Sequence, residues 1–450
     1  MNKDWLIIFI FIISLALNGQ EREKMPKEKE LPALTLKQCI DYALKNSPDL
    51  KKLKINYSDS KYDTIIARAA FDLGITVVSS RGDEDRENSH RVTLAQEIPG
   101  GLTLSTTGRL STDEISNTQQ SDLSVTLSKI LLGGGTLEES LQGIRDGLVD
   151  ELISLNTVNR EKRNIRFRVE RQFYRIIRNI QGLEIEKRRL ERAKKNLEHA
   201  KERDKPIDIA TAEIEIPENE LSLITANRRI ESELDNLKVI MGLPPDNKIK
   251  INEDFEYKTM KLNLEDDLFF AEKNEESFIN NALRKEKAER AVRIANSRTN
   301  VDLSLDVTHS IDSSGTSNAD LRGRNDQVIS LNLSFDLGQR ADKARLAKSK
   351  NSLEENSVDR YILRQNKMRT LRELQRTIEE TGKAVVIQEQ RITLSERQLE
   401  LYKDRWENGE IDILEYIRSQ NSLEDSKVRL INLKTTYMEL LSEYLFEVGK

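Results

Sequence analysis

Two stretches of the chain carry apolar residues at heptad spacing over an unusual length, at residues 138–204 and 341–408. The positions are Leu141, Leu148, Leu155, Val169, Ile176, Leu183, Leu190 and Leu197 in the first stretch, and Leu371, Ile378, Val385, Ile392, Leu399 and Trp406 in the second. Sustained heptads are typical of helices that pack lengthwise on other helices. Helices of this length extend for about 100 Å at 1.5 Å per residue, so they must lie in an elongated bundle or tube.

Each long helix is followed by a tight turn and a shorter partner helix, predicted at residues 207–241 and 411–448. Pro206 ends the first long helix and can begin its partner. Gly409 can adopt the left-handed conformation that ends the second long helix. The two pairs are therefore expected to be helical hairpins.

Short segments of alternating apolar and polar residues precede each long helix, within about 74–130 and 301–337. The polar residues of the clearest segment are Ser330, Asn332, Ser334 and Asp336. Such alternation has two interpretations. One is a soluble sheet with its apolar face on a core, and the other is a transmembrane barrel with an apolar lipid face and a polar lumen. The polar segments 111–120 and 309–325 predict loops between strands.

The second half of the chain repeats the first. Residues 208–242 match residues 415–449, which lie 207 positions later. The sequence therefore predicts a first structural repeat at 34–242, a connecting segment at 243–267 and a second repeat at 268–449. The expected fold class is mainly α with β, built from two helix–strand–helix halves.

The N-terminus has the pattern of a targeting segment. A short polar start is followed by an apolar run at residues 5–17, which predicts a signal peptide at 1–19 and a charged linker at 20–33. An uncleaved anchor is the alternative, although the run is short for a membrane span. No later stretch reaches about 18 apolar residues, so any further membrane entry would have to use strands.

Composition excludes several function classes. Charged residues make up 33% of the chain, but the net charge is only −5 and the basic residues are interleaved with acidic ones, which argues against a nucleic-acid partner. Cys39 is the single cysteine, so an intrachain disulfide and a thiolate metal cluster are impossible. His90, His199 and His309 fit no zinc-binding pattern. With no nucleophile arrangement either, neither an enzyme nor a cofactor is expected.

Three segments together resemble one known family. They are the opening helices from Leu34 to Leu50, the Leu-Leu-Gly-Gly-Gly junction at 131–135, and the turn and partner helix at 409–423. Their order, spacing and duplication resemble the TolC-type outer-membrane efflux family. The resemblance implies a homotrimer whose strands form one outer-membrane β-barrel and whose helices form a long periplasmic α-barrel. It also implies a duct that serves an inner-membrane transporter and a periplasmic adaptor protein, with outer-membrane lipid around the barrel.

The same resemblance implies where a gate would lie. Acidic residues near the periplasmic turn line the closed constriction in the family, and Glu415 falls at the first of these positions. Arg418 falls at the second, where the best-known members carry another acid. The expected gate residues are Glu415, Arg418, Asp208 (the repeat equivalent of Glu415) and Asp412, and the expected lumen-facing strand residues are Ser330, Asn332, Ser334 and Asp336. A solvated helix face is the alternative for the gate residues.

A soluble periplasmic coiled-coil adaptor or scaffold is the alternative for the whole chain. It would explain the long helices. It explains neither the duplication nor the two groups of strands, because an adaptor would carry one helical hairpin. The two hypotheses differ in where the protein would fractionate.

Overall fold

The structure is a computed structural model that describes residues 33–81, 87–113, 118–134, 136–252, 255–315, 322–334 and 338–450. The predicted signal peptide and all but the last residue of the predicted linker lie outside this range. The helices are α2 (Leu36–Asn46), α3 (Pro48–Ala69), α4 (Leu137–Ser140), α5 (Gln142–Glu202), α6 (Pro206–Met241), α7 (Leu264–Asn274), α8 (Glu276–Ser297), α9 (Arg340–Glu407) and α10 (Ile413–Val448). The strands are β1 (Gly74–Arg81), β2 (Glu87–Ile98), β3 (Leu102–Asp113), β4 (Thr118–Leu132), β5 (Asp302–Gly315) and β6 (Arg322–Ser334).

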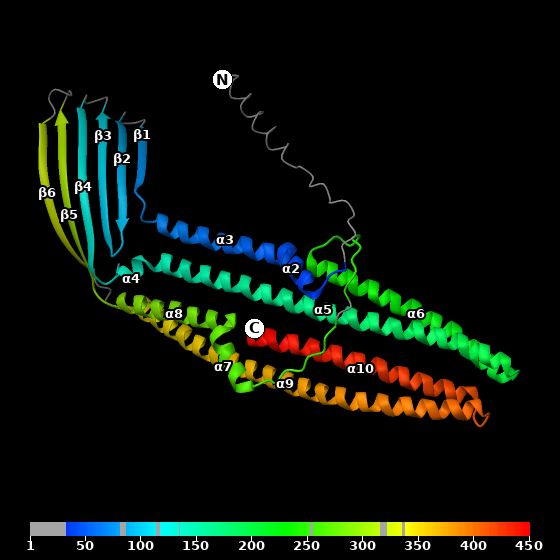
Figure 1. The fold of residues 1–450 in the computed structure, drawn as a ribbon. Helices are drawn as coiled ribbons and strands as arrows, with labels where there is room; N and C mark the ends of the chain where they lie inside the picture. The colour runs from blue at the N-terminus through cyan, green and yellow to red at the C-terminus, as the bar shows by residue number, and fades with distance from the viewer. Residues whose placement is uncertain are drawn as a thin grey trace, which may run out of the picture.

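All six strands form one antiparallel sheet in the order β1-β2-β3-β4-β5-β6, so β1 and β6 are its open edges. The sheet stands at one end of a long helical bundle, and the described helices cover neither of its faces (Figure 1). The additional strands of the first half join the same sheet as the others. Because no helix packs on the sheet to form a core, the apolar face of the sheet must be covered by something other than these helices.

The helices form a single layer that runs away from the sheet (Figure 1). In the half far from the sheet, α5 packs on α6, α10 packs on α9, and the two hairpins meet where α5 contacts α10. Nearer the sheet, α3 lies on α5 and α8 lies on α9. The predicted fold class, mainly α with β in two helix–strand–helix halves, is confirmed.

The two partner helices show how closely the halves correspond. Helices α6 and α10 each have 36 residues. Each ends at a glycine in the left-handed conformation, Gly242 at φ 67° and Gly449 at φ 96°. The two glycines are separated by the same 207 positions that separate the repeats in sequence.

Capping residues explain the opening helices. Thr35 and Gln38 form a reciprocal capping box at the start of α2. Ser47 accepts a hydrogen bond from the Leu50 amide at the start of α3, where Pro48 occupies the first turn. The Asn-Ser-Pro-Asp-Leu segment is therefore a break between two helices.

The predicted heptad seam is confirmed along most of α9, where Leu371, Ile378, Val385 and Trp406 are buried. It is wrong near the start of α5, because Leu148 is 40% exposed. There the closest approach uses small residues: a Cβ added to Gly147 would lie 3.0 Å from the Thr64 hydroxyl on α3. A glycine-lined contact brings the helix backbones together and leaves the leucine outside it.

The main buried cluster joins α2, α5 and α6 and includes Cys39. The thiol is fully buried, and this burial raises the pKa of Cys39 to about 12. A thiol with such a pKa is almost entirely protonated near neutral pH and therefore unreactive. Cysteines introduced elsewhere can consequently be labelled against an inert background.

Candidate functional site

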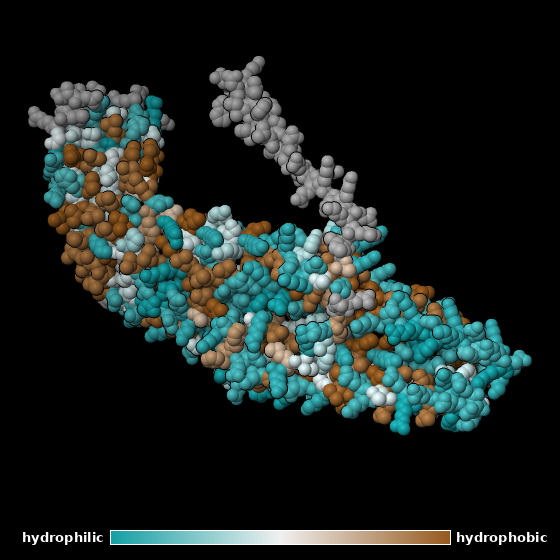
Figure 2. Space-filling view, viewed as in Figure 1, coloured by the Kyte–Doolittle hydropathy of each residue, from teal (hydrophilic) through white to brown (hydrophobic). Residues whose placement is uncertain are grey.

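The two faces of the sheet differ in chemistry. Side chains alternate between faces along a strand, and residues directly opposite on neighbouring strands share a face. The apolar sheet face contains Ile75, Val77, Val92, Leu94, Leu102, Leu104, Leu110, Leu123, Val125, Leu127, Leu303, Leu305, Val307, Ile311, Ile329, Leu331 and Leu333. Figure 2 shows apolar side chains gathered over the strands, with polar ones toward the strand tips.

The opposite face, here called the polar sheet face, consists mainly of hydroxyl and charged residues. Asn332 donates a hydrogen bond to Asp306 at 2.6 Å on this face. The expected lumen residues Ser330, Asn332 and Ser334 alternate with the apolar residues and all lie on it, while Asp336 lies outside the described residues. The polar sheet face is the candidate lining of a water-filled space.

The strand-to-helix junction joins the two halves of the chain. Gly133 has φ 88°, and the Gly134 amide donates to Asp302 Oδ1 at 3.0 Å. Two ion pairs lie beside it, Arg293–Glu138 at 2.6 Å and Arg298–Glu139 at 2.5 Å. The hydrogen bond from Arg293 lowers the pKa of the Glu138 carboxyl. The junction therefore connects the end of β4, the start of β5 and the end of α8.

The far ends of the two hairpins meet in an aromatic cluster. The buried Trp406 ring stacks on Tyr416 with 4.9 Å between centroids. The Arg203 guanidinium lies 4.2 Å from the Trp406 ring centre. Arg203 also donates to the Trp406 carbonyl at 2.7 Å and the Glu407 carbonyl at 3.1 Å. Arg203 thus connects the end of the first long helix to the last carbonyls of the second, where a cation is favourable.

Next to this cluster, on the side further from the turns, polar contacts join the first hairpin (α5 and α6) to α10. Buried Asn196 donates to Gln420 at 3.0 Å, and Arg192 pairs with Glu424 at 3.4 Å. Burial lowers the pKa of Arg192. Burial also raises the pKa of the Glu215 carboxyl, which accepts a hydrogen bond from Asn421. The hairpins therefore meet through hydrogen bonds and charges in this region.

The structure places the four expected gate residues at the same end of the molecule. Asp412 precedes α10, and Glu415 and Arg418 are exposed on its first two turns. Asp208 lies in the first turn of α6 and is buried. In the part of the chain that the structure describes, no ion pair joins Glu415 to Arg418. Their role as a gate therefore stays a prediction.

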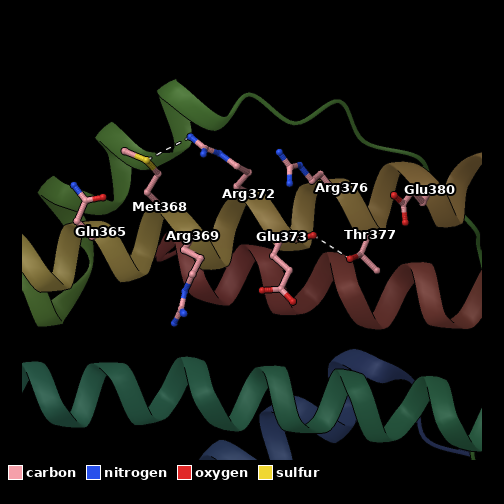
Figure 3. Close-up of a pocket in the computed structure, with 8 residues that line it drawn as sticks. All are labelled: Gln365, Met368, Arg369, Arg372, Glu373, Arg376, Thr377 and Glu380. Carbon is pink, nitrogen blue, oxygen red and sulfur yellow. Dashed lines mark hydrogen bonds between the residues drawn. The ribbon is translucent and has the colours of Figure 1, made fainter.

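A separate groove lies along α9, lined by Gln365, Met368, Arg369, Arg372, Glu373, Arg376, Thr377 and Glu380. Figure 3 shows that the Arg369 side chain points away from those of Arg372 and Arg376. The three guanidinium groups therefore do not converge on one point, as an anion site would require. Within the described ranges, no group of three His, Cys, Asp or Glu residues is placed to hold a metal ion. No described helix is both long and apolar enough to cross a lipid bilayer.

No family model matches the sequence, and no curated protein sequence is similar to it. Solved structures, in contrast, match over almost the whole chain. The outer membrane protein VceC from Vibrio cholerae is 15% identical, with a TM-score of 0.68 over 92% of this chain and 96% of VceC. The MtrE outer membrane channel of Neisseria gonorrhoeae is 14% identical, with a TM-score of 0.67 over 96% of both chains. The outer-membrane channel OprN is 11% identical, with a TM-score of 0.69 over 92% of this chain and 89% of OprN.

The chain has the fold of these outer-membrane channels. The fold of the single chain that the sequence resemblance implied is therefore confirmed. Within this fold, three places are candidates for function. They are the polar sheet face, the strand-to-helix junction, and the end where the hairpin turns meet.

Sequence reasoning found the polar face of β6 and the turn region, but it missed Arg203. The residue is the C-cap of a helix rich in Lys and Arg, so nothing in the sequence distinguishes its role from that of its neighbours. Only the packing of the second hairpin against the first brings it to the Trp406 carbonyl.

Proposed function

We propose that the protein is the outer-membrane exit duct of a tripartite efflux or type I secretion system. In this proposal it is a homotrimer whose sheets form one membrane barrel and whose helices form a periplasmic tube. A periplasmic adaptor protein and an inner-membrane transporter deliver substrates to the end formed by the hairpin turns.

The observation that carries the proposal is the uncovered apolar sheet face. In the protomer, Val77 is 68% exposed, Leu331 64% and Leu333 70%, and no described helix packs on this face. A contiguous apolar surface of this kind marks a protein or membrane contact. Its alternation with a polar face is the pattern of a transmembrane barrel, which favours lipid as the partner.

The open edges support assembly from several copies. The edge strands β1 and β6 leave one row of backbone groups unpaired on each side. With six strands alternating in direction, β6 of one copy would be antiparallel to β1 of the next. A closed ring of sheets would pair every edge and leave none in the membrane.

The helical layer has open edges with matching chemistry. Its edge helices in the far half are α6 and α9. Helix α6 exposes apolar residues at heptad spacing, Ile207, Ile214 and Leu221, and α9 does the same with Ile387, Leu394 and Leu401. Apolar heptad stripes pack lengthwise on another helix. They favour contact between α6 of one copy and α9 of the next, which would close a tube.

Fractionation of cells that produce the full chain tests the proposal. We expect recovery with outer membranes, an oligomer on unheated gels that dissociates on boiling, and ion conductance after reconstitution into planar bilayers. Recovery as a soluble periplasmic protein without conductance would support the coiled-coil scaffold instead.

We further propose that Glu415 lies at the periplasmic constriction, with Arg418, Asp208 and Asp412 nearby. Replacing Glu415 with alanine is expected to lower the cation selectivity of the channel about twofold, because a ring of carboxylates concentrates cations. The matched control is Glu410→Ala, which removes an exposed carboxylate of the turn that accepts a hydrogen bond from Arg405. Unchanged current and selectivity in Glu415→Ala would remove this residue from the gate.

A further inference from the structure

One level of the polar sheet face carries a charged residue on every strand from β2 to β6. The register places Arg91 opposite Arg109, Arg109 opposite Asp122, Asp122 opposite Asp312, and Asp312 opposite Arg324. Because directly opposite residues share a face, the five side chains follow one another across the strands. We call these five residues the charged row.

The charged row is narrow. On β1 the equivalent position is Val78, which lies opposite Arg91. The two neighbouring levels of the same face carry no charge on β1 to β5. Their residues are Ser80, Ser89, Ser111, Gln120 and Ser314 on one side, and Thr76, Thr93, Thr107, Ser124 and Ser310 on the other. Only β6 has further charges on the adjacent levels, Arg322 on the first side and Asp326 on the second.

Two of the four contacts between neighbours in the row are unfavourable for pairing of the strands. Arg91 lies directly opposite Arg109, and Asp122 lies directly opposite Asp312. Like charges at directly opposite positions destabilise a sheet. An order with alternating signs would use the same residues and avoid both contacts. The stability of the sheet therefore does not explain why the row has a basic pair beside an acidic pair. Departures of this kind are typical of functional positions.

The end of β3 and the start of β4 point away from the helices (Figure 1), and the charged row lies near these ends. Asp122 is close to the start of β4 at Thr118, and Arg109 is close to the end of β3 at Asp113. On the other face of the sheet, apolar residues lie on both sides of this level, with Leu110 just outside the row and Leu123 just inside it. In a membrane barrel, the row would therefore line the outer mouth of the lumen.

We propose that the charged row is a selectivity belt that contacts permeating solutes in two sectors, anionic groups at Arg91 and Arg109 and cationic groups at Asp122 and Asp312. This inference rests on the proposed trimeric duct. Three arginines and two aspartates give each protomer a net charge of +1 in the row, so three copies would carry +3. Six strands from each of three copies make 18, a number that leaves an aqueous channel. The belt would therefore act on solutes from the wall of the barrel, without closing the pore.

Reversal potentials of reconstituted channels in a KCl gradient test the belt. The double variant Arg91→Gln/Arg109→Gln is expected to shift the permeability ratio toward cations by about twofold or more. Asp122→Asn/Asp312→Asn is expected to shift it toward anions by a similar factor. This size follows from unit charges about 8 Å away in water, where the interaction is close to RT. Both shifts should disappear in concentrated salt, since it screens exposed charges.

The matched control is Ser124→Asn, which places the same amide one level below Asp122 on the same face of β4. It is expected to leave the permeability ratio unchanged. If both double variants conduct with the wild-type permeability ratio, the belt is overturned while the proposed duct stands. If the wild-type protein forms no channel, the duct itself fails, and the belt fails with it.

Chemical labelling covers the case in which a double variant does not assemble. Asp312 is exposed, and Cys39 is buried, so the thiol of Asp312→Cys is the one that water-soluble reagents should reach. Attachment of a negatively charged thiosulfonate is expected to restore the wild-type permeability ratio. Attachment of a positively charged one is expected to shift the ratio further toward anions. Identical ratios after both reagents would overturn the belt.

Discussion

Replacing Arg203 with alanine is expected to raise the conductance of the reconstituted channel severalfold. The substitution removes two hydrogen bonds from a guanidinium to the Trp406 and Glu407 carbonyls, together with the cation–π contact on Trp406. Bonds of this kind contribute about 1.5–3 kcal/mol each, and the ring contact about 1 kcal/mol. Because the bond to the Glu407 carbonyl is exposed to water and therefore weaker, we expect a total loss of about 3 kcal/mol, which would favour separation of the two hairpins by about 100-fold.

The matched control is Arg405→Ala, in the last turn of α9. Arg405 is 52% exposed and pairs with Glu410 of its own turn, at 3.4 Å. This variant should therefore conduct like the wild type. Arg203→Lys should give an intermediate conductance, because an ammonium keeps the charge but cannot reproduce the guanidinium fork. Equal conductance of the Arg203→Ala and Arg405→Ala channels would show that Arg203 does not hold the hairpins together.

The position of Arg203 shows why an interface between repeats is hard to derive from sequence. Heptads define which residues face a neighbouring helix, and they predicted the buried positions of α9 well. They do not say which helix that neighbour is. The pairing of α5 with α10 depends on contacts such as Asn196 with Gln420, which lie 224 positions apart and carry no periodic signal.

The strands show a different limit. Segment 309–325 is rich in Ser, Gly, Asn and Asp and segment 111–120 is polar, and their composition predicted loops. That prediction is wrong over much of both segments. In the first, β3 continues to Asp113 and β4 begins at Thr118; in the second, β5 continues to Gly315 and β6 begins at Arg322. Turn-forming composition normally indicates a loop. In a strand whose polar face is solvated, the same residues simply occupy alternate positions.

The charged row was hidden for this reason. Asp312 and Arg324 both lie inside the segment that composition assigned to a loop. Without the strand register, neither could be aligned with Asp122 or Arg109. The apolar face was easier to predict, since the alternation around Ile329 is strong enough to be recognised in a single strand.

Gly133→Ala is expected to prevent assembly of the oligomer. At φ 88°, Gly133 has a backbone conformation that costs an alanine about 1–2 kcal/mol. An added Cβ would also overlap the Asp302 carboxylate and lie 2.8 Å from the Asp302 Cα. Backbone atoms cannot move aside as a flexible side chain can, so the start of β5 would have to shift away from the end of β4. We expect heat-modifiable oligomer to be lost from the outer membrane.

Gly134→Ala is the matched control, one residue further along the same junction. Its φ is not positive, and an added Cβ would meet only the Glu139 carboxylate, at ordinary contact distances of 3.7 Å or more. The Gly134 amide could still donate to Asp302, so this variant should assemble normally. Normal assembly of Gly133→Ala would contradict the structure of the junction. Loss of assembly in Gly133→Ala alone would show that close contact between Gly133 and Asp302, one from each half of the chain, is needed to join the halves into one sheet.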